Sequence, residues 1–382
     1  MTRPVIPVMR PLLGEEEAAA VAEVVRSGWV AQGPRVAEFE KAFAASVGAA
    51  HGVAVSSCTT GLHLSLVLLG VGPGDEVVVP SFSFIATANA VRYCGATPVF
   101  ADVLRSSGNL DPAAVAAALT PRTKAVMAVH QGGQPCDVDA LRAVCGDIPV
   151  IEDAACAAGS QLRGRPVGEG ALLAAWSFHP RKLLTTGEGG MITTDDAEWA
   201  ARLRRLREHG MSVSAADRHA SGKVVLEEYA ETAFNYRMTD LQAAMGLVQL
   251  GRLPGMVARR RELVARYREL LAPLGVRPVE DPEFGASNHQ SFWVELPDGA
   301  PAVVDVLAGL AAAGVSARRG IMAAHREPAY AGHPHAPLPV TEHLTTRTLI
   351  LPVHHELTDA DQQRVVDALA AALLLTPATG AS

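Results

Sequence analysis

The sequence predicts an α/β protein with a large, mostly parallel β-sheet and a smaller α+β domain near the C-terminus. Through the first two-thirds of the chain, short apolar runs rich in valine and isoleucine alternate with helical segments. Strands of a parallel sheet have this composition because helices bury both faces of the sheet. After a long helical segment, strand-like and helix-like stretches alternate again. Since 382 residues are many for one hydrophobic core, we expect a large domain over residues 1–250 and a small domain over residues 251–382.

The individual elements follow from hydrophobic periodicity. The first expected strand covers residues 51–57 and precedes a helix at residues 59–70, in which leucines recur at helical spacing up to Gly70. Further strands are expected at residues 75–82, 96–103, 124–131, 148–155, 174–178 and 191–196, with helices at residues 111–119 and 137–145. A long helix that includes Pro254 begins near residue 238. The small domain follows with strands expected at residues 290–296 and 349–357 and helices at residues 302–315 and 358–374.

Composition and charge argue against several classes of function. The formal net charge is -7, so no broad basic surface is expected for a nucleic acid. No apolar run has the length of a membrane span, and the start of the chain lacks the pattern of a signal peptide. Five cysteines without a C-x-x-C pair suit a reducing compartment. We therefore expect a cytoplasmic protein with no nucleic-acid or membrane partner.

Polar and aromatic residues follow several of these strands, at the edge where α/β sheets bind ligands. The run 56–60 supplies hydroxyls and backbone N–H groups at a helix N-terminus, which suits a phosphate but also makes an ordinary helix cap. Asp153 follows one buried strand and Phe84 follows another. Taken alone, they would be explained by capping and by core packing. Ser177 and Lys182 follow the strand at residues 174–178.

Together these groups match the requirements of pyridoxal phosphate (PLP). A lysine forms an imine with the aldehyde, and an aspartate keeps the pyridine nitrogen protonated, so that the ring can accept the electrons of a broken Cα–H bond. A helix N-terminus binds the phosphate, and an aromatic ring covers the pyridine. Glycines after Lys182 let the backbone pass close to the cofactor. Each feature is weak alone, but their combination predicts a PLP site.

The chain resembles the nucleotide-sugar aminotransferases of the DegT/DnrJ/StrS group, which belong to the fold type I, aspartate aminotransferase-like PLP enzymes. The resemblance covers nearly the whole chain and is most specific in "SSCTTGLHLSL", "GPGDEVVVPSFSFIATANAV", "IEDAACAAGS", "SFHPRKLLTTGEGG" and "FNYRMTDLQAAMG". It implies a homodimer with active sites shared at the interface. It also implies transfer of an amino group from glutamate or glutamine to a keto-sugar, expected to be nucleotide-linked, in amino-sugar or antibiotic biosynthesis.

The resemblance further implies roles for individual residues. Lys182 is the expected Schiff-base residue, and Asp153 is expected to hold the pyridine nitrogen. The other expected cofactor contacts are Cys58, Thr59, Phe84, Cys156 and Ser177, together with Asn235, which reaches in from the neighbouring subunit. On the acceptor side, the expected residues are Glu188, Arg319 and His325.

Several positions depart from the family pattern or discriminate within it. Cys58 replaces the glycine of the usual Ser-Gly-Thr loop, which leaves a backbone contact possible, and Cys156 replaces a frequent Gln or His. A thiol is a weaker donor than either of these side chains. Arg318 and Arg319 replace part of a frequent His-Tyr-Pro segment, and they could bind a diphosphate or lie in solvent at a helix end. Related dehydratases carry histidine at the position of Lys182, so a lysine there favours transamination.

Other interpretations remain open from the sequence. A dinucleotide-dependent dehydrogenase would share the sheet, but no G-x-G-x-x-G run follows a strand. A zinc hydrolase would use histidines such as His354 and His355, whose spacing matches no standard ligand pattern, so no metal is expected. Within the PLP class, the acceptor could also be a keto-cyclitol or another secondary-metabolite ketone. A non-catalytic sensor protein could use the same fold, because a fold does not fix a function.

Overall fold

The computed structural model describes residues 4–213, 218, 224 and 226–374. Its largest feature is a seven-stranded sheet in the order β1-β9-β8-β5-β4-β2-β3. The strands are β1 (His51–Val55), β2 (Glu76–Pro80), β3 (Thr97–Ala101), β4 (Thr123–Val129), β5 (Val150–Asp153), β8 (Ala174–Ser177) and β9 (Gly190–Thr194). Strand β9 is antiparallel to β1 and β8, and the other neighbouring pairs are parallel. The expected mostly parallel sheet is therefore confirmed.

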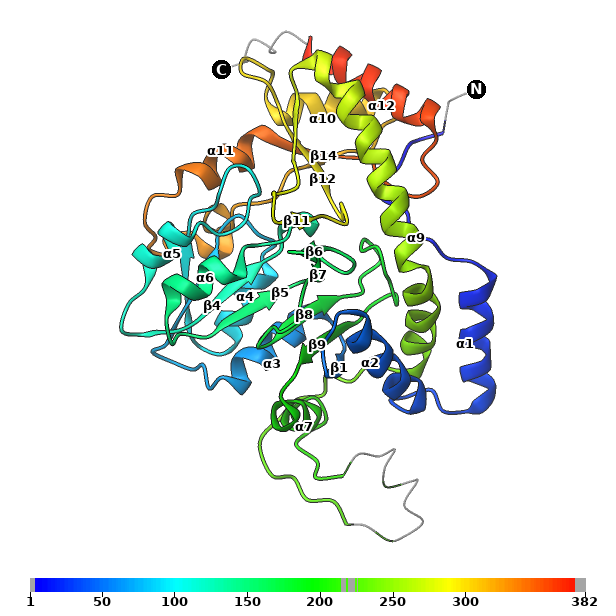
Figure 1. Cartoon of the computed structure of the whole chain (residues 1–382), viewed down its shortest axis with the longest axis vertical. Coiled ribbons are helices and arrows are strands. Elements are labelled where there is room, and N and C mark those ends of the chain that lie inside the picture. Colours follow the sequence, from blue (N-terminus) through cyan, green and yellow to red (C-terminus); the bar gives the residue numbers. More distant parts are fainter. Residues whose placement is uncertain (1–3, 214–217, 219–223, 225, 375–382) are drawn as a thin grey trace.

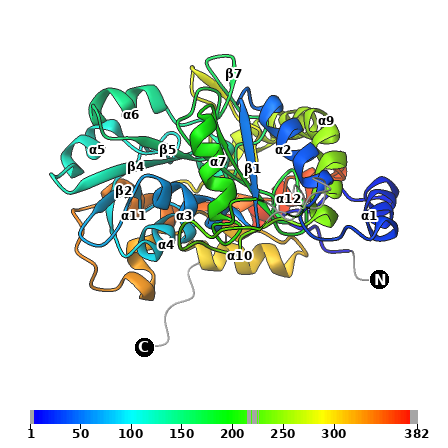
Figure 2. The ribbon, with the colours of Figure 1, turned by 90° about the horizontal axis from the view of Figure 1, so that it is seen from below.

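Helices cover both faces of this sheet, which is why its strands are apolar on both sides. Val77 and Val79 of β2 belong to a buried apolar cluster that includes residues of α3, α4 and α7, whereas Val78 belongs to a second cluster with residues of α2, α5, α6 and α9. Figure 2 shows α5 and α6 on the opposite side of the sheet from α3 and α4. The helices are α2 (Pro34–Ser46), α3 (Cys58–Leu68), α4 (Ala86–Tyr93), α5 (Pro112–Ala118), α6 (Val138–Cys145), α7 (Ala197–Leu206) and α9 (Asp240–Leu271).

A second sheet, with four strands in the order β10-β12-β14-β13, lies toward the C-terminal end of the chain. Its core also contains Ile6, which forms a parallel bridge with Val315, so the N-terminal segment packs with the C-terminal part. Its elements are β10 (Arg277–Pro278), β12 (Phe292–Glu295), β13 (Arg318–Arg319), β14 (Thr348–Leu351), α10 (Val303–Ala312), α11 (Pro339–Arg347) and α12 (Asp359–Leu373). A small third sheet contains β6 (Gln161–Leu162), β7 (Arg165–Pro166) and β11 (Gly285–Ala286).

Helix α9 connects the two larger sheets. It runs past α1 (Glu15–Ser27) and α2 and reaches the small sheet near α12 (Figure 1). Thr239 caps its N-terminus and forms a reciprocal capping box with Gln242, and Pro254 lies within the helix, as the sequence predicts. Because α9 passes through residue 250 without a break, the division of the chain at that residue stays a prediction. No helix in the described ranges is long and apolar enough to cross a membrane.

Candidate active site

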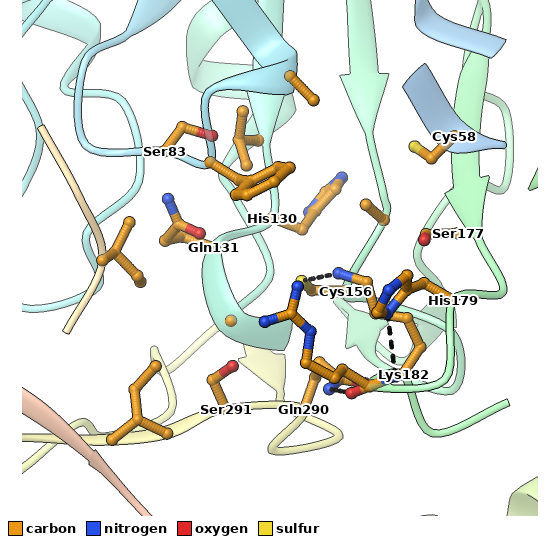
Figure 3. Close-up of a pocket in the computed structure, with 18 of the residues that line it drawn as sticks. Cys58, Ser83, His130, Gln131, Cys156, Ser177, His179, Lys182, Gln290 and Ser291 are labelled. Atoms are coloured by element: carbon orange, nitrogen blue, oxygen red, sulfur yellow. Dashed lines mark hydrogen bonds between the residues drawn. The ribbon is translucent and has the colours of Figure 1, made fainter. Parts of the chain in front are cut away.

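A cavity of about 370 Å³ lies at the carboxyl edge of the large sheet and is closed on its other side by residues from the second sheet. Loops that follow β1, β2, β4, β5 and β8 supply its walls. Nine of the predicted site residues line it: Cys58, Thr59, Phe84, Asp153, Cys156, Ser177, Lys182, Glu188 and Arg319. Segments far apart in the sequence thus converge on one cavity (Figure 3).

The amine of Lys182 faces Cys156 within this cavity (Figure 3). Lys182 Nζ donates a hydrogen bond to Cys156 Sγ over 3.0 Å. Burial favours the neutral amine, but the neighbouring Cys156, Cys58 and Asp153 outweigh it and raise the pKa of Lys182. The backbone is fixed as well, because Lys182 N–H donates to the carbonyl of His179 over 2.8 Å. The single lysine of this loop is therefore held by both its main chain and its side chain.

Asp153 is a buried carboxylate at the end of β5. The hydroxyl of Thr87 donates to its Oδ2 over 3.0 Å, and the backbone N–H of Ala155 donates to its Oδ1 over 3.2 Å. Burial raises the pKa of Asp153, while these two donors and nearby Lys182 oppose the shift. A further cationic group in the cavity would favour the ionised carboxylate.

The N-terminus of α3 forms another wall of the cavity. Ser57 is its N-cap and accepts a hydrogen bond from the N–H of Thr60, while the first-turn N–H groups of Cys58 and Thr59 have no partner within the helix. Strand β9 passes close to this turn, because a Cβ atom on Gly190 would lie 2.5 Å from the carbonyl carbon of Ser57. Glycine at this position therefore permits the close contact between β9 and the first turn of α3.

The cavity wall includes the positively charged side chains of Arg181, Arg318 and Arg319. Arg319 pairs with Glu327 over 3.0 Å, whereas no carboxylate in the described part of the chain pairs with Arg181 or Arg318. Burial lowers the pKa of Arg318, and the positive charges of Arg181 and Arg319 lower it further. The predicted residue Glu188 is exposed, and its Oε1 lies 3.9 Å from Nε2 of His179.

Two predicted residues do not line the cavity of their own chain. His325 is buried, and its Nδ1 is hydrogen-bonded to the hydroxyl of Ser81 over 2.7 Å. Because His325 does not line the cavity of its own chain, its expected contact with the acceptor stays a prediction. Asn235 is exposed, although the carbonyl of its neighbour Tyr236 accepts a hydrogen bond from the N–H of Ser56.

A family model described as the DegT/DnrJ/EryC1/StrS aminotransferase family matches residues 11–370. The chain belongs to this family. It is therefore a PLP-dependent aminotransferase of fold type I, and the dehydrogenase, zinc-hydrolase and sensor interpretations are set aside.

Solved structures of similar proteins agree with this assignment. The chain is 39% identical to the aminotransferase TlmJ from Streptoalloteichus hindustanus, with 96% of this chain and 98% of TlmJ covered and a TM-score of 0.88. It is 36% identical to DesI, solved in the presence of its TDP-sugar product, with 98% of this chain and 94% of DesI covered and a TM-score of 0.88. Spr1654 from Streptococcus pneumoniae, solved in a PMP form, is 28% identical, with 96% and 98% covered and a TM-score of 0.90.

The donor set of the aminotransferase cavity fits PLP. The cavity combines one lysine amine, one buried carboxylate and a helix N-terminus with free N–H groups, which are Lys182, Asp153 and the first turn of α3. Ser177 lies at the same edge, at the end of β8. Phe84 remains 59% exposed, so its ring is free to contact a ligand in the cavity that it lines. These groups would provide the amine, the carboxylate for the pyridine nitrogen and the phosphate-binding donors that PLP requires.

Sequence reasoning missed several residues of this site. Thr87 donates a hydrogen bond to Asp153, but it lies in the first turn of α4, beyond the loop that follows β2. His130 follows β4, and its position at a strand end was the signal that could have found it. The N–H of Cys136 donates to His130 Nδ1, so Nε2 carries the proton and donates to Glu152 over 3.1 Å. His130 is thus a fixed, fully buried ring in the cavity wall.

Proposed function

We propose that this aminotransferase transfers the amino group of glutamate or glutamine to a nucleotide-linked keto-hexose. The observation that carries the proposal is the group of Arg181, Arg318 and Arg319 at the cavity, two of which have no carboxylate partner among the described residues. A diphosphate between sugar and nucleoside would supply the anionic partner, because one guanidinium group can donate two parallel hydrogen bonds to the oxygens of a phosphate. DesI, with its TDP-sugar product, provides a precedent for such an acceptor among similar chains.

The proposed roles of the chain's own residues follow from their positions. Lys182 would hold the cofactor and then move a proton between the donor Cα and the cofactor through its Nζ. Asp153 would keep the pyridine nitrogen protonated, and the first turn of α3 together with Ser177 would bind the phosphate. When bound, PLP supplies an electron sink for the broken Cα–H bond. Glu188 and His179, which lie next to each other at the cavity, would contact the acceptor.

We also propose that the enzyme is a homodimer in which Asn235 completes the phosphate site of the partner subunit. Asn235 does not line its own cavity, and its side chain is exposed. Large apolar side chains on the preceding segment are exposed as well: Val224, Leu226 and Tyr229 are 95%, 85% and 61% exposed. Burial of such side chains against a second subunit would be favourable.

Half-reaction spectra test the proposed acceptor. The enzyme is first converted to its pyridoxamine form with glutamate or with glutamine, and excess donor is removed. Return of the PLP spectrum is then followed with nucleotide-linked keto-hexoses, the corresponding free sugars and keto-cyclitols. We expect fast return only with the nucleotide-linked sugars, and Arg318→Gln should weaken that reaction without slowing the donor half-reaction. Equal rates with a keto-cyclitol that carries no phosphate would contradict the proposal.

A further inference from the structure

A short segment that precedes β12 ties together the loops that form the cavity floor. We call residues 288–291 the strap. The N–H of Ser291 donates to the carbonyl of Gly132 over 2.9 Å, and the N–H of Asn288 donates to the hydroxyl of Ser160 over 3.0 Å. These bonds connect the strap to the loops after β4 and β5. The strap therefore fixes the start of the small sheet against the carboxyl edge of the large one.

Within the strap, the side chain of Gln290 bonds to the backbone on both sides of Lys182. Its Oε1 accepts a hydrogen bond from the N–H of Leu183 over 2.7 Å. Its Nε2 donates to the carbonyl of Arg181 over 2.6 Å. One carboxamide thus uses its donor and its acceptor on the two peptide groups that flank the amine-bearing residue. This arrangement fixes the direction in which the Lys182 side chain leaves the main chain.

Gln290 is itself held from two directions. Its N–H donates to Asn288 Oδ1 over 2.8 Å, and its carbonyl accepts from Arg260 Nη1 over 3.2 Å. Burial lowers the pKa of Arg260 to about 9, which still leaves the guanidinium charged at neutral pH. Arg260 also donates to the carbonyl of His289, whose φ of 50° lies in the left-handed region. The turn at His289 is therefore held in place by a charged donor on α9.

The same strap also positions Cys156, the partner of the Lys182 amine. Asn288 Nδ2 donates to the carbonyls of Cys156 and Ala158, each over 2.8 Å. A Cβ atom on Gly133 would overlap Asn288 Oδ1, and Gly133 has a φ of 98°, so the close approach of the two loops requires glycine there. Asn288 and Gln290 thus fix the two sides of the Lys182–Cys156 contact.

We propose that Gln290 is a positioning residue for Lys182, which it aims into the cavity by bracketing its backbone. This inference rests on the proposed role of Lys182 as the residue that binds PLP covalently. Reactions that depend on geometry lose about 10²-fold when a group is misplaced by about 1 Å. We therefore expect loss of the bracket to slow covalent attachment of PLP to the protein, whereas phosphate binding at α3 is retained.

The test measures how fast PLP attaches to cofactor-free protein, by visible absorbance at saturating PLP. In the wild type, the borohydride-reduced adduct is first mapped by mass spectrometry; an adduct on another lysine would overturn the role of Lys182 itself. Gln290→Leu should then slow attachment roughly 10-fold to 10²-fold. The matched control is Gln362→Leu, which removes a buried glutamine that donates to the carbonyl of Leu263 in the small-domain core. The control should attach PLP at the wild-type rate.

Gln290→Glu separates positioning from a general loss of stability. An ionised carboxylate can accept from Leu183 N–H, but it cannot donate to the carbonyl of Arg181, which it would repel. A protonated carboxyl group has one donor and one acceptor, as glutamine does. The attachment rate relative to wild type should therefore recover as the pH falls, whereas the defect of Gln290→Leu should stay constant. Wild-type attachment rates in both variants, or a pH-independent defect in Gln290→Glu, would overturn the proposal.

Discussion

At the scale of single residues, each buried ionisable group of this site has a specific hydrogen-bond partner. Asp153 is buried but accepts hydrogen bonds from Thr87 and from the backbone of Ala155. Lys182 has Cys156 as its acceptor. Unpaired buried charges would be costly, so such pairs are the usual condition for keeping ionisable groups inside a protein. The pKa values of both Asp153 and Lys182 are raised by their surroundings.

Lys182→Ala tests the residue on which the mechanism depends. The variant should lose covalent attachment of PLP, although it can still bind the cofactor through α3 and Ser177. Turnover should fall by about 10²-fold to 10⁴-fold, because the proton-transferring group is missing. Two measurements check this: steady-state transamination, and borohydride treatment, which in the wild type should abolish the visible absorbance band and leave PLP covalently bound, whereas Lys182→Ala should retain no covalent PLP. Lys124→Ala is the matched control, since Lys124 is exposed at the start of β4. Wild-type turnover in Lys182→Ala would refute the assignment.

Asp153→Asn removes the negative charge while it preserves the size of the side chain. The amide oxygen can still accept from Thr87, so we expect the variant to fold and to bind PLP. Without the charge, the pyridine nitrogen is no longer held protonated, and the donor half-reaction should slow roughly 10²-fold or more. Single-turnover spectra with glutamate measure this rate. An undiminished rate would remove Asp153 from its proposed role.

At the scale of elements, the sequence predicted most of the strands of the large sheet. It also predicted those cavity residues that lie at the end of a strand or directly follow it. Strand ends carry Asp153, Ser177 and the α3 cap, and the periodic pattern located these ends. Thr87 and Gln290 could not be found this way, because they reach the site through tertiary contacts that no local pattern encodes. The placement of a side chain against an element distant in the sequence depends on packing, which a single sequence does not display.

Helix α3 and helix α12 provide a matched pair of capping boxes for an element-scale prediction. Ser57 and Thr358 each accept a hydrogen bond from the third residue of their helix. Ser57→Ala and Thr358→Ala should each destabilise the cofactor-free protein by about 1 kcal/mol. Only Ser57→Ala should also weaken PLP binding, because α3 begins at the cavity and α12 does not. Thermal unfolding and PLP titration measure the two effects. Equal PLP affinity in both variants would show that the α3 turn does not bind the phosphate.

At the scale of the whole molecule, the cavity lies between two sheets that are joined by α9 and by ion pairs. Glu295 of β12 pairs with Arg105, which follows β3 of the large sheet, and also with Arg277 and His343. The strap provides the hydrogen-bonded connection on the other side. The site is therefore assembled from both parts of one chain, and the proposed role of Asn235 adds a second chain.

Hybrid dimers test whether Asn235 acts in the partner's site. Lys182→Ala and Asn235→Asp homodimers should both be nearly inactive, since the first lacks the amine and the second places a carboxylate beside the phosphate. A hybrid isolated with two different affinity tags contains one chain of each kind. If Asn235 acts across the interface, both lesions fall in one site and the other site is intact, so activity should return to about half that of the wild type.

The opposite arrangement gives a different result with the same material. If Asn235 acted within its own chain, each site of the hybrid would carry one lesion and the hybrid would stay inactive. A hybrid of Lys182→Ala with wild type is the control, and it should show about half activity in either case, because one site is always complete. Its activity also proves that tagging and exchange leave the dimer functional. An inactive Lys182→Ala/Asn235→Asp hybrid beside an active control would therefore place Asn235 in its own subunit's site and exclude the proposed shared one.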